Sequence, residues 1–277
     1  MGQAVYISFN SLEEIFLNFS ECREYTSLEK IIHEHSDVLV DMCDDDFEKI
    51  KNENIILKSL IKRPSKKCFA LKEHFENLSY SEMYDQSHDI YILDKEDSDC
   101  EDLSNKSGVI VTNLSLIKNS NLPIFKRKNQ FLKKNTTYSE KIDNIDRKDW
   151  GLVFYKADIG PMNAIIINDN HLFNNWKDYI QNTIDIINSA ISNSLNCAFQ
   201  VLIVIENSEG KYKKELLEKI LTRIDESVGN DFPNKVQTSI LTHPKKDVFH
   251  ERLIISNYQS LTSHYGFNVF VTTQQQS

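Results

Sequence analysis

The residues with the clearest chemical potential in this sequence lie in the segment 249–257. Its apolar residues predict a buried strand, and alternation along such a strand places His250 and Arg252 on one face. An imidazole can attack phosphorus or carry a proton, while a guanidinium can hold the charge of a phosphate group. The pattern indicates a phosphate site in which His250 attacks phosphorus or carries a proton and Arg252 holds the charge, with the amide Asn257 five residues further on. A salt-bridge network that only supports a turn fits the same residues.

A second candidate is a basic segment in the middle of the chain, residues 118–134. It contains no acidic residue, and Phe125 and Phe131 lie among its cations. Cations interleaved with aromatic rings can follow a phosphate backbone and stack on bases. A solvated linker between two domains has the same composition. The candidate nucleic-acid contacts are Lys126, Arg127, Lys128, Lys133 and Lys134.

Two aspartates form a third candidate, because Asp41 and Asp94 each follow an apolar strand in the first half of the chain. Ligand and metal sites of parallel α/β sheets gather at the carboxyl ends of strands, where carboxylates can hold Mg²⁺ or Mn²⁺. PIN-like nucleases use such a metal site. The neighbouring aspartates 44–46 are equally typical of the acidic start of a helix.

The elements that position these residues follow from hydrophobic periodicity. Short apolar runs at 4–8, 37–42, 88–94 and 108–112 predict strands in the first half. Helices are predicted over 12–19, around 27–35 and over 66–78, and the apolar residues of 44–61 have loose helical spacing. Strands at 162–168, 199–205, 236–241 and 249–257 alternate with amphipathic helices over 172–194 and 212–228. The fold class is therefore α/β, with two α/β domains and mostly parallel sheets. We expect an N-terminal domain over 1–114, a basic linker over 115–150 and a C-terminal domain over 151–277.

Composition limits the function classes. The formal charge of −9 excludes a protein that coats nucleic acid with its whole surface. The motifs GxGxxG, GxxxxGK[ST] and GxSxG are missing, so no cofactor is expected, and the five scattered cysteines do not have zinc-site spacing. No apolar run is long enough to span a membrane, and no signal peptide is evident, which favours the cytoplasm. The many Asn, Ile and Lys residues are typical of a low-GC bacterial genome, where defence is a common role for such accessory proteins.

The second half resembles the phospholipase D superfamily in the order of its elements and in one motif. The family's signature is a histidine, any residue, a lysine, four residues and an aspartate. Here His250, Arg252 and Asn257 stand at those positions. The chain is also similar to the phospholipase D-like C-terminal domain of MIT-domain-containing proteins, with the string 166–173 as the opening element and 266–270 as the closing one.

The resemblance implies a phosphodiester-directed hydrolase, a nuclease in the first instance, in which Asn257 orients the imidazole of His250. The superfamily uses two facing motifs, and this chain offers one, so activity implies a homodimer that pools two copies of His250. The MIT-associated relatives imply the alternative, a non-catalytic module that holds a phosphate-bearing ligand or a partner protein. Arginine binds phosphate as lysine does, but an asparagine cannot stabilise a charged imidazolium as a carboxylate would.

Overall fold

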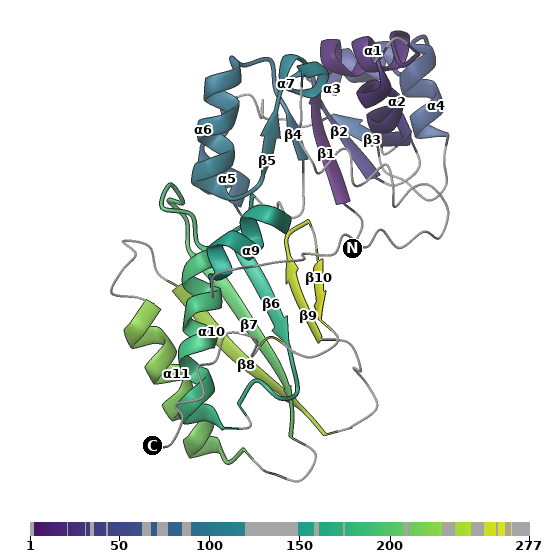
Figure 1. The fold of residues 1–277 in the computed structure, drawn as a ribbon. Helices are drawn as coiled ribbons and strands as arrows, with labels where there is room; N and C mark the ends of the chain where they lie inside the picture. The colour runs from purple at the N-terminus through teal and green to yellow at the C-terminus, as the bar shows by residue number, and fades with distance from the viewer. Residues whose placement is uncertain are drawn as a thin grey trace. The chain divides into compact units, whose positions relative to one another are not determined.

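The computed structural model describes residues 3–20, 22–30, 32–33, 36–42, 44–62, 68–70, 77–84, 90–119, 149–157, 161–173, 175–207, 210, 212–228, 236–244, 252–258, 260–263 and 267. The chain divides into two compact units, Met1–Glu140 and Lys141–Ser277 (Figure 1). Each unit is built on its own sheet of five strands. The positions of His250 and of the five basic residues at 126–134 fall outside the described residues.

The first unit is a fully parallel sheet with the strand order β3-β2-β1-β4-β5. Its strands are β1 (Gln3–Ser8), β2 (Ser36–Asp41), β3 (Cys68–Ala70), β4 (Ile90–Ile92) and β5 (Ile110–Thr112). Every residue of β4 and β5 is buried, as expected for strands that are covered on both faces. The strand order reverses between β1 and β4, so the carboxyl ends of these two strands form the topological switch point.

The helices of this unit are α1 (Phe9–Leu17), α2 (Arg23–Lys30), α3 (Asp44–Ile50), α4 (Ile55–Ile61), α5 (Tyr80–Tyr84), α6 (Asp97–Ser107) and α7 (Leu114–Asn119). Ser8 caps α1 by accepting a hydrogen bond from the backbone N–H of Ser11, and Asn54 caps α4 in the same way. Met83 from α5 and Cys100 from α6 pack with Tyr91, Leu93, Val109 and Val111 in a fully buried cluster.

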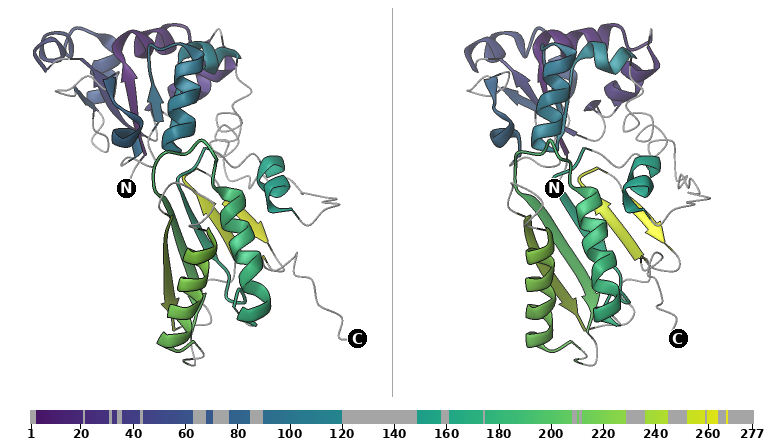
Figure 2. Two further views of the ribbon diagram at one scale, coloured as in Figure 1. Left: turned by 90° about the vertical axis from the view of Figure 1, so that its left-hand side faces the viewer. Right: turned by 60° about the vertical axis from the view of Figure 1, so that its left-hand side comes forward.

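The second unit is a mixed sheet with the strand order β10-β9-β6-β7-β8. Strands β6 (Ala164–Asn168), β7 (Phe199–Glu206) and β8 (Val236–His243) are parallel, while β9 (Arg252–Ser256) runs antiparallel to β6 and β10 (Ser260–Ser263) antiparallel to β9. Helices α10 (Trp176–Ala190) and α11 (Lys214–Val228) cover one face (Figures 1 and 2), and α9 (Trp150–Ala157) contacts α10.

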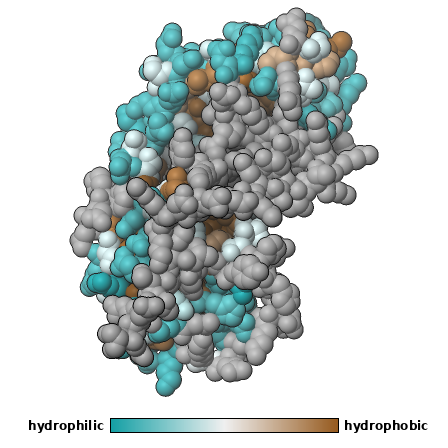
Figure 3. All heavy atoms as spheres, in the orientation of Figure 1, coloured by the Kyte–Doolittle hydropathy of each residue, from teal (hydrophilic) through white to brown (hydrophobic). Residues whose placement is uncertain are grey.

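Alternation along the strands separates the two faces of this second sheet. Phe199, Val201, Ile203 and Ile205 of β7 are buried, whereas Gln200 between them is exposed. The covered face is therefore a continuous apolar core under α10 and α11. The described atoms visible in Figure 3 are mainly hydrophilic with small apolar areas. None of the helices in the described part of the chain has the length and apolarity that a membrane span requires.

Two expectations from the sequence need correction, and a third is confirmed with one difference. The C-terminal sheet is mixed and not mostly parallel, because β9 runs antiparallel to β6 and β10 antiparallel to β9. The prediction of a helix over 66–78 is wrong for Cys68–Ala70, because these residues form strand β3 beside β2. The run 44–61 is helical, as its loose helical spacing predicts, but a turn at 51–53 divides it into two helices.

Candidate functional site

Polar side chains collect at the edge of the second sheet where the parallel strands end. Asp169 directly follows β6, Glu206 ends β7 and His243 ends β8. Arg252 begins the antiparallel β9 and therefore lies at the same edge, next to Asp169. The N-termini of α10 and α11 also lie at this edge, because each helix follows a parallel strand, and they contribute partial positive charge. This edge is the usual place for a ligand in an α/β sheet.

Asp169 anchors this site, and its side chain is fully buried. One carboxylate oxygen, Oδ1, accepts a hydrogen bond of 2.9 Å from the backbone N–H of His171, and Oδ2 accepts one of 2.8 Å from that of Phe267. The Nε atom of Arg252 is 3.7 Å from Oδ1. A buried carboxylate with two backbone donors and a cation has a fixed position, and it fixes the cation in turn.

A series of buried hydrogen bonds connects Phe267, which donates to Asp169, with helices α10 and α9. Phe267 accepts a hydrogen bond of 2.8 Å from the side-chain amide of Asn182 on α10 through its backbone carbonyl. The Oδ1 atom of Asn182 accepts one of 2.9 Å from the indole N–H of Trp150 on α9. The rings of Trp150 and Phe267 are 6.1 Å apart. The site is thus tied to two helices of the unit's core.

Tyr212 brings a further titratable group to the same edge from the loop between β7 and α11. Asn207 holds this loop, because its side chain accepts a hydrogen bond of 2.8 Å from the Tyr212 N–H and donates one of 3.0 Å to the Tyr212 carbonyl. Burial raises the pKa of the Tyr212 phenol, and the negative charges of Asp169 and Glu206 raise it further. The Tyr212 hydroxyl is therefore protonated at neutral pH.

Arg252 and Asn257, both predicted from the sequence, are not brought together. They lie at opposite ends of β9, about 17 Å apart for five residues of extended strand. The side-chain Oδ1 atom of Asn257 accepts hydrogen bonds of 3.0 and 3.1 Å from the backbone N–H groups of Asn163 and Ala164. Its amide donates one of 2.7 Å to the Asn163 side chain. These bonds join the chain after β9 to the start of β6.

Asp41 and Asp94 do share one edge of the first sheet. Asp41 is the last residue of β2, and Asp94 follows β4, so β1 lies between them and the strands are about 10 Å apart. The Asp94 carboxylate accepts a hydrogen bond of 2.9 Å from the Ser11 hydroxyl on α1. A hollow of about 840 Å³ beside it is lined by residues 93–99 and 113–115. Among the described residues, no three His, Cys, Asp or Glu side chains are grouped so that they could hold a metal ion.

The aspartates at 44–46 occupy the first turn of α3, and Asp46 pairs with Lys49 one turn later at 3.1 Å. Acidic side chains at this place stabilise the helix through its dipole. Their position agrees with the helix-start interpretation of these residues.

Sequence reasoning assigned no role to Asp169, Tyr212 or Glu206. Asp169 lies inside the string 166–173, which resembles the opening element of the MIT-associated domains. This resemblance is the one feature of the sequence that could have pointed to Asp169 as a site residue. Its partner Arg252 is 83 positions further along the chain, so no local pattern joins the two. No family model and no characterised protein matches the sequence.

Proposed function

We propose that the second unit binds a phosphate-bearing ligand at the carboxyl edge of its sheet, with Arg252 as the principal cation. The observation that carries this proposal is the ion pair between Arg252 and the buried Asp169. The pair fixes the guanidinium before any ligand arrives, which lowers the cost of ordering it on binding.

Two further features support an anionic ligand at this edge. The Arg252 side chain is 24% exposed, so it reaches solvent while its Nε side is turned to Asp169. A guanidinium has five N–H donors in a planar fork that matches phosphate oxygens. The N-termini of α10 and α11 add positive potential, since they follow β6 and β7.

Phosphodiester hydrolysis at the same site is the second candidate, with His250 as nucleophile or acid-base. One observation favours it: a buried carboxylate, Asp169, stands next to Arg252. The sequence motif has Asn257 at the place of the family's aspartate, and Asn257 is at the far end of β9. If the site is catalytic, Asp169 is the better candidate for the group that stabilises an imidazolium.

Binding is tested by the anisotropy of a labelled single-stranded oligonucleotide, with inorganic phosphate as competitor. Arg252→Ala should weaken binding about tenfold or more, because a charged hydrogen bond contributes about 1.5–3 kcal/mol. The matched control is Arg223→Ala, which removes an exposed guanidinium from α11 and should leave the affinity unchanged. Equal losses in both variants would mean that net charge alone is recognised, and the proposal would fail.

Cleavage of single- and double-stranded DNA and RNA by the wild type and by His250→Ala, with and without EDTA, separates binding from hydrolysis. Cutting that resists EDTA and disappears in His250→Ala supports hydrolysis at the second sheet. Cutting that EDTA abolishes and the variant retains would move the chemistry to Asp41 and Asp94 in the first unit. If no nucleic acid is cut and binding depends on Arg252, the hydrolysis candidate fails and the ligand-binding proposal is kept.

A further inference from the structure

Phe267 is held at the Arg252 site although it lies far along the sequence from Asp169. Its backbone N–H donates a hydrogen bond of 2.8 Å to Oδ2 of Asp169, and its carbonyl accepts one of 2.8 Å from the side-chain amide of Asn182. Phe267 belongs to none of the described helices and strands, so no described ladder of backbone hydrogen bonds fixes it. Its position therefore depends on side chains of the site.

The ring of Phe267 is part of the same arrangement. The residue is 4% exposed, and its ring centroid is 6.1 Å from that of Trp150 on α9. We call Phe267 docked when this ring is buried and its N–H donates to Asp169. A movement that brought the ring into solvent would also take the N–H away from the carboxylate, so the two contacts are gained and lost together.

Arg252 and Phe267 share one carboxylate. The Nε atom of Arg252 is 3.7 Å from Oδ1 of Asp169, whereas the Phe267 N–H donates to Oδ2. The Asp169 side chain is fully buried, so water does not replace a donor that leaves. When one donor weakens, the buried charge depends more on the donors that remain. Arg252 and Phe267 are therefore coupled through Asp169.

The sign of this coupling follows from the charges. An anion on Arg252 competes with Asp169 for the guanidinium and adds negative charge close to a buried carboxylate. Both effects raise the cost of losing the Phe267 N–H. In the other direction, an Oδ2 atom that already accepts from Phe267 is a weaker second acceptor for Arg252, which favours contact of the guanidinium with a ligand.

We propose that Phe267 is a positioning residue of the Arg252 site, and that its docking and the binding of a phosphate-bearing ligand strengthen each other. This inference rests on the proposed function of the second unit. Linkage makes the coupling reciprocal, so the factor by which ligand favours docking equals the factor by which docking raises affinity. Couplings between two sites are typically about fivefold or more, which is a measurable change.

Cleavage of the full chain by chymotrypsin after Phe267 measures docking directly. The protease takes an aromatic side chain into its own pocket, so the buried ring must first leave its place. The initial rate of release of residues 268–277 is followed by mass spectrometry with and without inorganic phosphate. Saturating phosphate should slow this release about fivefold or more in the wild type and should not change it in Arg252→Ala.

Phe199 supplies the internal reference for this measurement. It is fully buried in the inner strand β7, so cleavage after Phe199 requires the sheet to open. Phosphate should slow cleavage after Phe267 by a larger factor than cleavage after Phe199. Equal factors at the two residues would mean that the ligand acts only on the unfolding of the whole unit, and the specific coupling would be refuted.

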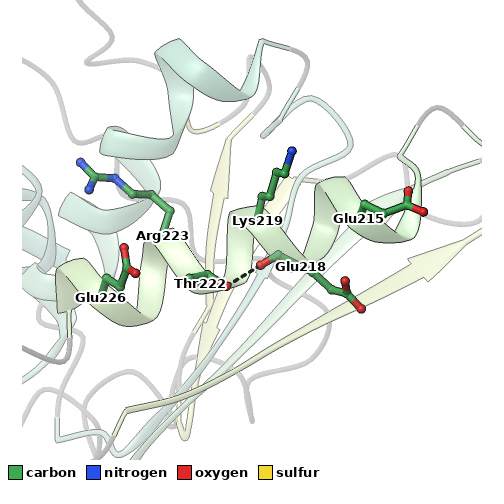
Figure 4. Close-up of a pocket in the computed structure, with 6 residues that line it drawn as sticks. All are labelled: Glu215, Glu218, Lys219, Thr222, Arg223 and Glu226. Atoms are coloured by element: carbon green, nitrogen blue, oxygen red, sulfur yellow. Dashed lines mark hydrogen bonds between the residues drawn. The ribbon is translucent and has the colours of Figure 1, made fainter.

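Arg223 supplies the control for phosphate that is held elsewhere on the surface. Figure 4 shows Lys219 and Arg223 extending from α11 beside a hollow of about 330 Å³. Exposed cations of this kind attract anions weakly and have no described contact with Phe267. Arg223→Ala should therefore keep the protection of Phe267 by phosphate. Loss of protection in this variant would overturn the assignment of the linked site to Arg252.

Two substitutions of Phe267 separate the roles of its ring and its N–H. Phe267→Leu loses the ring and keeps the N–H, while Phe267→Pro loses both, because proline has no N–H. The oligonucleotide affinity should fall in Phe267→Pro by about the factor found in the cleavage experiment, and Phe267→Leu should recover most of that loss. A wild-type circular dichroism spectrum shows that each variant is folded. Equal affinities of the two variants would refute the role of the N–H.

The outcomes separate this inference from the proposed function on which it rests. If neither phosphate nor the oligonucleotide binds the wild type, both fail. If binding depends on Arg252 but phosphate leaves the cleavage after Phe267 unchanged, the proposed function is kept and the coupling is refuted. Protection that requires Arg252, together with the larger loss of affinity in Phe267→Pro, supports both.

Discussion

Replacement of Asp169 by asparagine is the sharpest perturbation of the second unit. The substitution keeps the size of the side chain and removes its charge. An amide has a single carbonyl oxygen, so it can accept from only one of the two N–H groups, of His171 and Phe267, that now donate to the carboxylate. The other N–H would face an NH₂ group, and Arg252 would lose its buried counter-ion.

The expected cost follows from these contacts. A buried backbone N–H without an acceptor costs about 1–3 kcal/mol. Loss of one partner from a buried ion pair costs about 3–5 kcal/mol, and we take the lower end because Arg252 is 24% exposed and its separation from the carboxylate is 3.7 Å. The two effects overlap in one network, so the free energy of unfolding should fall by about 3–5 kcal/mol.

Urea unfolding followed by tryptophan fluorescence measures this loss directly. Both tryptophans of the chain, Trp150 and Trp176, belong to the second unit, so the signal reports on that unit. A double-mutant cycle with Arg252→Met isolates the ion pair and should give a coupling free energy above about 1 kcal/mol. A loss below about 1 kcal/mol for Asp169→Asn, or a coupling near zero, would refute the view that Asp169 anchors the site.

Three further outcomes follow from other contacts. Asn257→Ala removes three hydrogen bonds and should lower the free energy of unfolding by about 1–3 kcal/mol in urea. The folded variant should keep its phosphate affinity. A loss of affinity at unchanged stability would contradict the connecting role of Asn257. Asn182→Leu leaves the buried indole N–H of Trp150 without its acceptor, so a loss of about 1–3 kcal/mol and an altered Trp150 emission spectrum are expected in urea and fluorescence measurements. Burial raises the pKa of Tyr25 to about 12, so between about pH 10 and 12 the unfolded chain loses this proton before the folded chain does, and the free energy of unfolding falls with rising pH. Urea titrations at several pH values should show a shallower fall in Tyr25→Phe than in the wild type. An equal fall in both proteins would contradict the raised pKa of Tyr25.

Much of the architecture could be predicted from the sequence because it depends on local patterns. The apolar runs at 4–8, 37–42, 162–168 and 199–205 each became a strand, and the periodic segment 212–228 became α11. Such segments bury an apolar face in any packing arrangement, so their type is fixed by periodicity. Helix α6 escaped prediction because its sequence, DSDCEDLSNKS, is polar and buries only Cys100 and Ser107. The three-residue β3 is too short to show any period.

The spacing of Arg252 from His250 on one predicted strand indicated a chemical role for it, but only the tertiary structure supplied its partner Asp169. Strand pairing between β6 and β9 sets Arg252 beside Asp169, and the pairing direction sends Asn257 to the other end of the strand. The bond between Asn257 and Asn163 spans 94 positions of sequence. Spacing in a sequence predicts neighbours only within one helix or strand, because the order and direction of strands are set by the packing of the whole sheet. The sequence by itself therefore determined which side chains have the charge and hydrogen-bonding groups that suit a phosphate, and the fold of the second sheet decided that Arg252 lies beside Asp169 and far from Asn257.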